Sequence, residues 1–180
     1  EITSIPQIKL SSGNLTIGGV AGRNEAGGNI SGIKVQGVKF EGFYNYGYLG
    51  GIAGENQQGA VVKNCIYSNG VMKEAADSTA AGNCYGGIIG DNYGILENCK
   101  VEDFTFSITG IYTATSTSSA KEKEALSSHV GGIAGKNGSS GEVRGCVIGG
   151  KSNTIDTGSG MAGGIVGYNG GSIELSGDEA

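Results

Sequence analysis

The chain has 180 residues, of which 37 are glycine and only 1 is proline, and its formal net charge is -5. The length suits one domain. The glycines follow no Gly-X-Y period and 37% of the residues are hydrophobic, which excludes collagen-like and disordered chains. Acidic and basic residues are mixed along the chain, so there is no basic face for nucleic acid. No stretch approaches the roughly 20 apolar residues that span a membrane.

A motif of the form Gly-Gly-aliphatic-x-Gly-x-Asn recurs along the chain. It reads GGVAGRN from Gly18, GGIAGEN from Gly50, GGIIGDN from Gly86, GGIAGKN from Gly131 and GGIVGYN from Gly163. The copies start 32, 36, 45 and 32 residues apart, a spacing typical of solenoids, propellers and arrays. The fourth copy alone looks like a phosphate-binding loop. The position of its Lys136 is not kept for a cation, however, because the other copies hold Arg23, Glu55, Asp91 and Tyr168 there.

Each copy predicts three short strands. The first is centred on the aliphatic motif position, at Val20, Ile52, Ile88, Ile133 and Ile165. The second carries Ile30, Val62, Leu96, Val143 or Ile173. The third carries Ile33, Cys65, Cys99, Cys146 or Ser176, followed two residues later by Val35, Tyr67, Val101 or Ile148 in the first four copies. This i, i+2 spacing places both side chains on one face of a strand.

Strands this short bury a core only when the copies stack on one another. The sequence therefore predicts an all-β fold, a parallel β-solenoid (β-helix) of about five coils with three short strands per coil. The motif asparagines fit a ladder at a turn, because Asn tolerates left-handed backbone geometry and its amide can bond to its equals in neighbouring coils. They are Asn24, Asn56, Asn92, Asn137 and Asn169.

The whole chain, 1–180, is predicted to form a single solenoid domain. Residues 1–17 would supply an N-terminal cap and first strand, with coils starting near 18, 50, 86, 131 and 163. The two longest spacings predict inserted loops at about 72–83 and about 104–128, and the charged end of the second can form a short helix. The start lacks an initiator Met and a signal-peptide pattern, so we expect a mature or excised fragment. Because an open solenoid end needs a cap, we also expect either further chain or end-to-end pairing.

The repeated unit, Gly-Gly-(Ile/Val)-(Ala/Ile/Val)-Gly-x-Asn with a following aliphatic-x-x-Cys strand, resembles the GLUG motif. The resemblance covers five copies from about Gly18 to Gly177. This repeat occurs in bacterial surface and secreted proteins, including some immunoglobulin A1 peptidases, outside their catalytic part. It implies a non-catalytic extracellular or cell-surface module that serves as a stalk or adhesin. It does not imply peptidase activity, because the zinc motif His-Glu-x-x-His is missing and His129 is the only histidine.

Two acidic residues, Glu55 and Asp91, hold equivalent positions in adjacent copies, which stacks two carboxylates on the coil exterior. Such a pair can ligate calcium or, at a suitable separation, cleave glycosides. Alternatively, the order Arg23, Glu55, Asp91, Lys136 gives each acid an oppositely charged neighbour, and surface pairing of that kind is ordinary. Calcium-binding β-roll repeats carry Asp where Asn stands here. No metal and no cofactor is therefore predicted.

Aromatic residues gather in the stretch FEGFYNYGYLGG of a chain otherwise poor in them. If exposed, they form a platform for sugar rings or a protein hot spot; if packed, they cover a coil corner. The candidate ligand-binding residues are Tyr44, Tyr46, Tyr48, Glu55 and Asp91, and no catalytic residue is predicted. The expected partner is a host or cell-surface protein or a glycan. The rival hypothesis is a carbohydrate-binding or carbohydrate-active β-helix, which as an enzyme would need two or three convergent acids or bases in a groove.

Three of the four cysteines, Cys65, Cys99 and Cys146, occupy one repeat position and are expected to form an inward column. Parallel Cβ vectors make disulfide geometry awkward between stacked coils. Buried free thiols that act as small apolar fillers are therefore favoured. Cys84 lies elsewhere in the unit and has no evident partner in the sequence.

Overall fold

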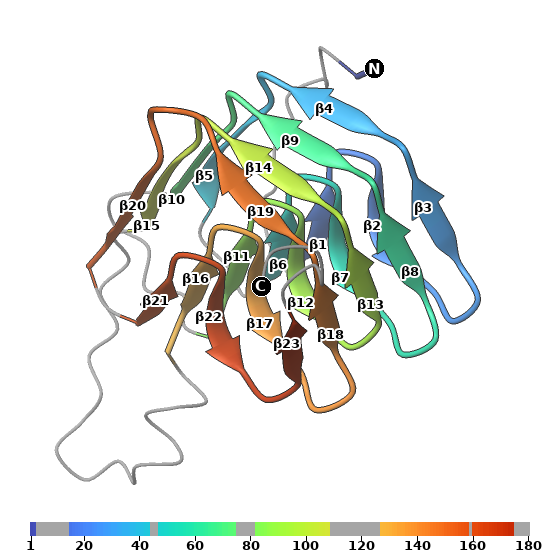
Figure 1. Cartoon of the computed structure of the whole chain (residues 1–180). Helices are drawn as coiled ribbons and strands as arrows, with labels where there is room; N and C mark the ends of the chain where they lie inside the picture. Colours follow the sequence, from blue (N-terminus) through green and yellow to red (C-terminus); the bar gives the residue numbers. More distant parts are fainter. Residues whose placement is uncertain (3–14, 44–46, 75–81, 109–126, 159, 175–180) are drawn as a thin grey trace, which may run out of the picture.

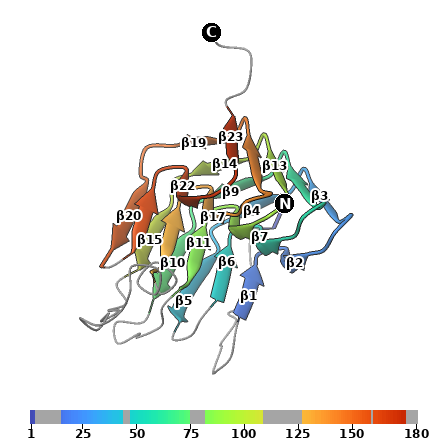
Figure 2. The ribbon, with the colours of Figure 1, turned by 90° about the horizontal axis from the view of Figure 1, so that it is seen from below.

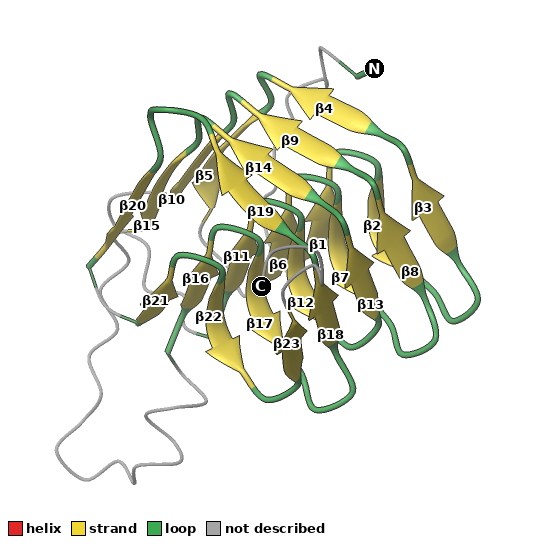
Figure 3. Ribbon diagram, in the orientation of Figure 1, coloured by secondary structure: helices red, strands yellow, loops and turns green. Residues whose placement is uncertain are grey.

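The computed structural model describes residues 1–2, 15–43, 47–74, 82–108, 127–158 and 160–174. Within these ranges every regular element is a β-strand, as Figure 3 shows. Each strand pairs in parallel with its equivalent in the next coil, which builds a β-solenoid (Figure 1). The predicted fold class is confirmed. The described residues include no helix long and apolar enough to cross a membrane.

Five parallel sheets run along the solenoid, and successive coils add one strand to each (Figure 2). Sheet 1 contains β1 (Leu15–Gly18), β6 (Gly47–Gly50), β11 (Cys84–Gly86), β16 (His129–Gly131) and β21 (Met161–Gly163). Sheet 2 contains β2 (Ala21–Asn24), β7 (Ala53–Asn56), β12 (Ile89–Asn92), β17 (Ala134–Asn137) and β22 (Val166–Asn169). Sheet 3 contains β3 (Asn29–Ser31), β8 (Val61–Lys63), β13 (Ile95–Glu97), β18 (Glu142–Arg144) and β23 (Ser172–Glu174).

The other two sheets have four strands each. Sheet 4 contains β4 (Lys34–Gln36), β9 (Ile66–Ser68), β14 (Lys100–Glu102) and β19 (Val147–Gly149). Sheet 5 contains β5 (Lys39–Phe43), β10 (Val71–Glu74), β15 (Thr105–Ile108) and β20 (Thr154–Thr157). The described chain thus forms four complete coils and the first three strands of a fifth, close to the predicted five coils.

The prediction of three strands per coil is wrong, because each complete coil has five. The second and third predicted strands exist, as sheets 3 and 4. The first does not, since Ile52 and its equivalents lie at the corner between sheets 1 and 2. A Cβ at Gly50 would overlap the backbone oxygen of Ala53, and one at Gly51 would overlap the ring of Tyr67. The glycine pair is therefore required for a sharp corner, and two strands flank it.

Sheet 5 is the strand set that the sequence patterns missed. It contributes the buried side chains of Phe40, Met72 and Phe106 to the core. Its strands β10 and β15 lie partly inside the segments predicted as inserted loops. Residues 75–81 and 109–126 of those segments, which include the predicted short helix, lie outside the described ranges. Residues 3–14 of the predicted cap also lie outside the described ranges.

The core is one apolar cluster enclosed by the five sheets. Equivalent residues of successive coils stack into columns, such as Val62, Leu96 and Val143 of sheet 3, which are all at most 1% exposed. The cysteine column is confirmed: Cys65 and Cys99 are buried, Cys146 is half-buried, and all three are free thiols.

In every complete coil, left-handed backbone occurs at two equivalent turns. The turn from sheet 3 to sheet 4 has positive φ at Gly32, Asn64, Asn98 and Gly145, and the turn from sheet 4 to sheet 5 has it at Gly37, Asn69, Asp103 and Gly150. Gly, Asn and Asp are the residues that adopt this geometry most readily. These columns let the chain turn twice per coil without breaking the ladder of backbone hydrogen bonds.

The motif asparagines form the predicted amide ladder. Asn24 Nδ2 donates to Asn56 Oδ1 over 2.9 Å, and the same bond is repeated from coil to coil at 2.9, 2.8 and 2.9 Å up to Asn169. The expected left-handed geometry is wrong, because these residues end the strands of sheet 2 and have no positive φ. Asn56, Asn92 and Asn137 are 0% exposed, so the ladder satisfies amides that water cannot reach.

Replacing the middle rung, Asn92→Ala, should lower the free energy of unfolding by about 2–4 kcal/mol, because Asn56 Nδ2 loses its ladder acceptor and Asn137 Oδ1 loses its donor where water cannot replace them. Asn169→Ala removes the exposed last rung and should cost less than about 1 kcal/mol. Urea unfolding followed by circular dichroism measures both. Equal losses for the two variants would contradict a stabilising role for the buried ladder.

Candidate functional site

Two columns of side chains lie between sheets 1 and 2, on the side away from the core. The column on sheet 1 consists of Thr16, Tyr48, Cys84, His129 and Met161, in register from coil to coil. The column on sheet 2 consists of Arg23, Glu55, Asp91, Lys136 and Tyr168. We call these the facing columns. The His129 and Tyr168 rings, one from each column, have centroids 5.1 Å apart, which shows how closely the two sheets approach.

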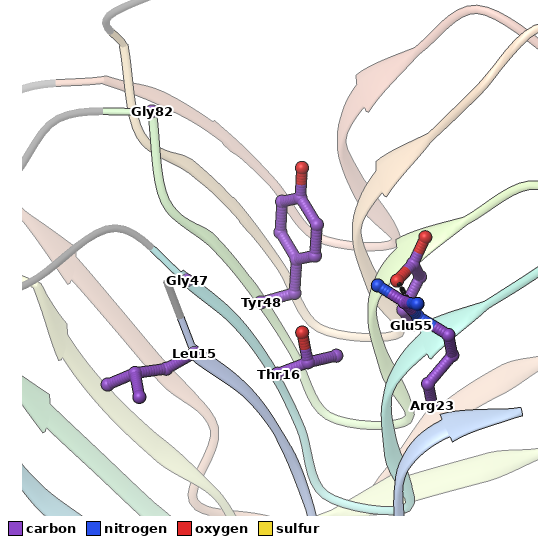
Figure 4. Close-up of a pocket in the computed structure, with 7 residues that line it drawn as sticks. All are labelled: Leu15, Thr16, Arg23, Gly47, Tyr48, Glu55 and Gly82. Atoms are coloured by element: carbon purple, nitrogen blue, oxygen red, sulfur yellow. Dashed lines mark hydrogen bonds and ion pairs between the residues drawn. The ribbon is translucent and has the colours of Figure 1, made fainter. Parts of the chain in front are cut away.

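A pocket with a volume of about 420 Å³ opens at the N-terminal end of the facing columns (Figure 4). Leu15, Thr16, Gly47, Tyr48 and Gly82 line it on one side, and Arg23 and Glu55 on the other. Figure 4 shows the half-buried Tyr48 ring standing between the two strands, opposite the ion pair of Arg23 and Glu55. The pocket therefore combines an aromatic ring, a hydroxyl, a guanidinium and a carboxylate.

Two hydrogen bonds fix the side chain of Glu55 in the lining of this pocket. Arg23 Nε donates to Glu55 Oε2 over 2.6 Å, and Gln57 Nε2 donates to Glu55 Oε1 over 2.7 Å. The pair with Glu55 raises the pKa of Arg23. The carboxylate is only 8% exposed as a residue, so both oxygens are fixed as acceptors and the charge is compensated where water is scarce.

Asp91 lies one coil further along the same column and is more deeply buried, with 1% exposure. Lys136 Nζ lies 3.3 Å from its Oδ2, whereas its Oδ1 has no hydrogen-bond partner among the described residues. Burial raises the pKa of Asp91, Lys136 opposes this, and Glu55 adds to it. Desolvation thus outweighs the attraction of the lysine.

Lys136 is shared between Asp91 and an aromatic side chain outside the motif. Its ammonium donates to the Tyr93 hydroxyl over 2.8 Å and lies 4.9 Å from the centre of that ring. Burial opposes its charge, but Tyr93 and Asp91 together raise the pKa of Lys136. Tyr93 directly follows the ladder Asn92, a position that the repeat alignment had not marked as functional.

The two predicted carboxylates stack in register, and each pairs with the cation on its far side, as the charge order predicts. Their expected exposure on the coil surface is wrong, because sheet 1 covers them. Only Glu55 lines the pocket, together with Tyr48. Tyr44 and Tyr46 lie outside the described residues. No group of three or more His, Cys, Asp or Glu suited to a metal occurs in the described ranges.

Cys84 and His129 form a contact that the sequence did not reveal, with Sγ 3.7 Å from Nδ1. They are equivalent residues of adjacent coils in sheet 1. Burial, followed by the negative charge of Asp91, raises the pKa of Cys84. A buried thiol with a raised pKa is a poor nucleophile, so this pair packs the facing columns rather than supplying a thiolate.

Comparison with known proteins finds no matching family model, no matching curated protein and no matching solved structure.

Removing the cation beside Asp91, with Lys136→Met, should lower the free energy of unfolding by about 2–3 kcal/mol, because it leaves a buried carboxylate uncompensated. Adding Asp91→Asn should restore most of that loss. The matched control is Lys100→Met, which breaks an ion pair whose side chains are 42% and 29% exposed and should cost less than about 1 kcal/mol. Urea unfolding measures all three, and a loss no larger than that of the control would count against a buried charge.

The raised pKa of Asp91 gives stability a defined pH dependence. The folded protein holds this proton more tightly than the unfolded chain, whose Asp pKa is about 3.9. Stability contributed by Asp91 should therefore rise as the pH falls from neutral through the raised pKa, and level off below the unfolded value. On acidification, the free energy of unfolding of the wild type should therefore rise relative to that of Asp91→Asn, as measured by urea unfolding at a series of pH values.

Asp103 provides a comparison of opposite sign. Backbone N–H groups of Lys151 and Ser152 donate to its Oδ1 over 2.7 and 3.0 Å and lower the pKa of Asp103. The stability that the Asp103 carboxylate contributes should be present above the pKa of Asp in the unfolded chain. It should be lost as the pH falls through the lower pKa of Asp103 in the folded protein. The two substitutions should therefore change the pH dependence of the free energy of unfolding in opposite directions. A change in the same direction for Asp91→Asn and Asp103→Asn would contradict the raised pKa of Asp91.

Proposed function

We propose that this chain is a non-catalytic repeat module of a bacterial cell-surface or secreted protein, acting as a stalk or adhesive segment that holds a ligand at the Tyr48 pocket. The observation that carries the proposal is the pocket itself, which joins Tyr48 and Thr16 to the ion pair of Arg23 and Glu55. The extracellular setting is taken from the resemblance to GLUG repeats.

A stalk or adhesin needs a stiff body, and the observed packing supports such a role. The five sheets share one core, and every coil is joined to the next by backbone hydrogen bonds and by the amide ladder. In stacked-repeat proteins each repeat contacts its neighbours and extended surfaces result. The pocket would therefore be presented on a support that keeps its geometry.

The chemistry of the pocket suits a polar ligand of low net charge, such as a glycan or a polar segment of a host or cell-surface protein. A tyrosine offers an apolar face together with a hydroxyl. The guanidinium of Arg23 and the carboxylate of Glu55 cancel in charge, yet their remaining donor and acceptor capacity can orient hydroxyl or amide groups. A small number of placed polar groups around an aromatic side chain is the usual composition of such sites.

The enzymatic alternative, a carbohydrate-active β-helix, is less well supported. Glycoside cleavage needs one carboxyl group that gives up a proton and another that acts as base or nucleophile. Here both oxygens of Glu55 already accept hydrogen bonds, while Asp91 is buried behind Lys136 and does not line the pocket. This arrangement favours binding without cleavage.

The test is a glycan-array and surface-protein binding screen with the wild type, followed by titration of any ligand found. Tyr48→Ala should weaken binding by at least about tenfold, which is the effect expected of an aromatic hot spot. Tyr93→Ala is the matched control, since Tyr93 is also a half-buried tyrosine beside the facing columns but does not line the pocket. Equal losses for both variants, or cleavage of the bound polysaccharide that Glu55→Gln abolishes, would overturn the proposal.

A further inference from the structure

The described strands leave unpaired edges at both ends of the solenoid, and sheets 1, 2 and 3 are the sheets to which the described part of the last coil contributes. Strands β21, β22 and β23 are outermost at one end of sheets 1, 2 and 3, and β1, β2 and β3 are outermost at the other. No described strand pairs with the outer edges of these six strands. Unpaired strand edges are templates for pairing with another chain.

The backbone groups at the two ends are complementary, because hydrogen bonds between coils have a fixed direction at the glycine corner. Within the stack, Gly132 N donates to Gly164 O over 3.0 Å and Ile133 N donates to Ile165 O over 2.9 Å. The same position is used at the other end, where Val20 N donates to Ile52 O over 2.9 Å. In every pair the earlier coil donates and the later coil accepts.

It follows that, at the glycine corner, the last coil offers donors and the first coil offers acceptors. By the repeat, the outward donors are the N–H groups of Gly164, Ile165 and Val166, and the outward acceptors are the carbonyls of Gly19 and Val20. The amide ladder has the same polarity, since each Asn donates to the next. Among the described residues, Asn169 Nδ2 has no acceptor and Asn24 Oδ1 has no donor.

Apolar side chains at the two ends also match. Ile173 belongs to the column whose inner members Val62 and Leu96 are 0% exposed, yet it is 44% exposed itself. At the other end Val20 is 38% exposed, whereas its equivalent Ile52 is 0% exposed. Covering each end with one more coil would bury these side chains as the inner coils bury theirs.

The N-terminal Ile2 supplies a rung in a sheet to which the described part of the last coil contributes no strand. Ile2 pairs in parallel with Val35 of β4, donating to Lys34 O over 2.8 Å and accepting from Gln36 N over 2.9 Å. It therefore adds to sheet 4, one of the two sheets to which the described part of the fifth coil contributes no strand. The described strands of the last coil and the Ile2 rung would thus occupy different sheets of one combined coil.

We propose that two copies of this chain stack head to tail, with β21, β22 and β23 of one copy pairing in parallel with β1, β2 and β3 of the next. In the register of the repeat, Asn169 donates to Asn24 of the second copy and Ile173 packs on its Ile30. The contact joins two different surfaces, so it is heterologous and can add further copies. Arg23 of the second copy lies in the column position next to Tyr168, where a guanidinium can stack on the ring.

Sedimentation velocity and light scattering of the whole chain under reducing conditions test this. The mass should rise with concentration above the 18.0 kDa of one chain. Val20→Glu and Ile173→Glu, at opposite ends, should each stay at the mass of one chain while keeping the circular dichroism of the wild type. Ile66→Glu is the control, because Ile66 is half-buried on the outer face of sheet 4 and belongs to an inner coil; it should associate like the wild type.

Mixing the two end variants distinguishes head-to-tail contact from other modes. Val20→Glu keeps an intact last coil and Ile173→Glu keeps an intact first coil, so an equimolar mixture should form particles of twice the chain mass and no larger. A wild type that remains at one chain mass at every concentration would overturn the proposal. So would a mixture that stays monomeric, or an Ile66→Glu variant that associates as poorly as the end variants.

Discussion

Register between coils is the constraint on which the rest of the structure depends. The strands are only three to five residues long, so the backbone groups of each are satisfied chiefly by the coils before and after it. A shift by one residue would turn every inward side chain outward. The amide ladder opposes such a shift, because each inner Asn must both accept from one neighbour and donate to the other. Buried polar groups with two obligatory partners fix alignment more sharply than apolar columns do.

The same register explains why charged residues came to lie in a buried place. The glycine at the fifth motif position, such as Gly54 or Gly90, lets sheet 2 approach the backbone of sheet 1 so closely that a Cβ would overlap Tyr48 O or Leu49 N. Side chains on the outer faces of the two sheets are consequently enclosed between them. Between the sheets, the negative charges of Asp91 and Glu55 are compensated by Lys136 and Arg23. The pocket lies at the N-terminal end of these facing columns.

Much of the fold could be predicted from the sequence, since the five glycine motifs, the aliphatic column and the Asn column each recur in order. The number of strands per coil could not. The sequence pattern predicts a strand at the glycine pair. In the structure the pair forms a corner so tight that it has no room for a Cβ. Sheet 5 was missed because Phe40, Met72 and Phe106 follow the motifs at positions that vary in residue type.

The candidate site was predicted only in part. Ion pairing was predictable, because equivalent residues of neighbouring coils must be adjacent and a cation flanks each acid in the order Arg23, Glu55, Asp91, Lys136. Their burial depends on the angle between sheets 1 and 2, which no one-dimensional pattern encodes. The involvement of Tyr93 and the contact of Cys84 with His129 depend on the same angle. Sequence reasoning thus found neighbours along the solenoid axis but not across it.

The variation in repeat length is concentrated at one corner of the coil. The links from sheet 5 to sheet 1 comprise residues 44–46, 75–83, 109–128 and 158–160, whereas the links at the glycine corner always contain two residues. Gly47 directly follows the first of these links, Gly82 lies near the end of the second, and both line the pocket. Residues can thus be inserted along a single seam of the molecule, beside the pocket, without any change to the strand pairing of the five sheets.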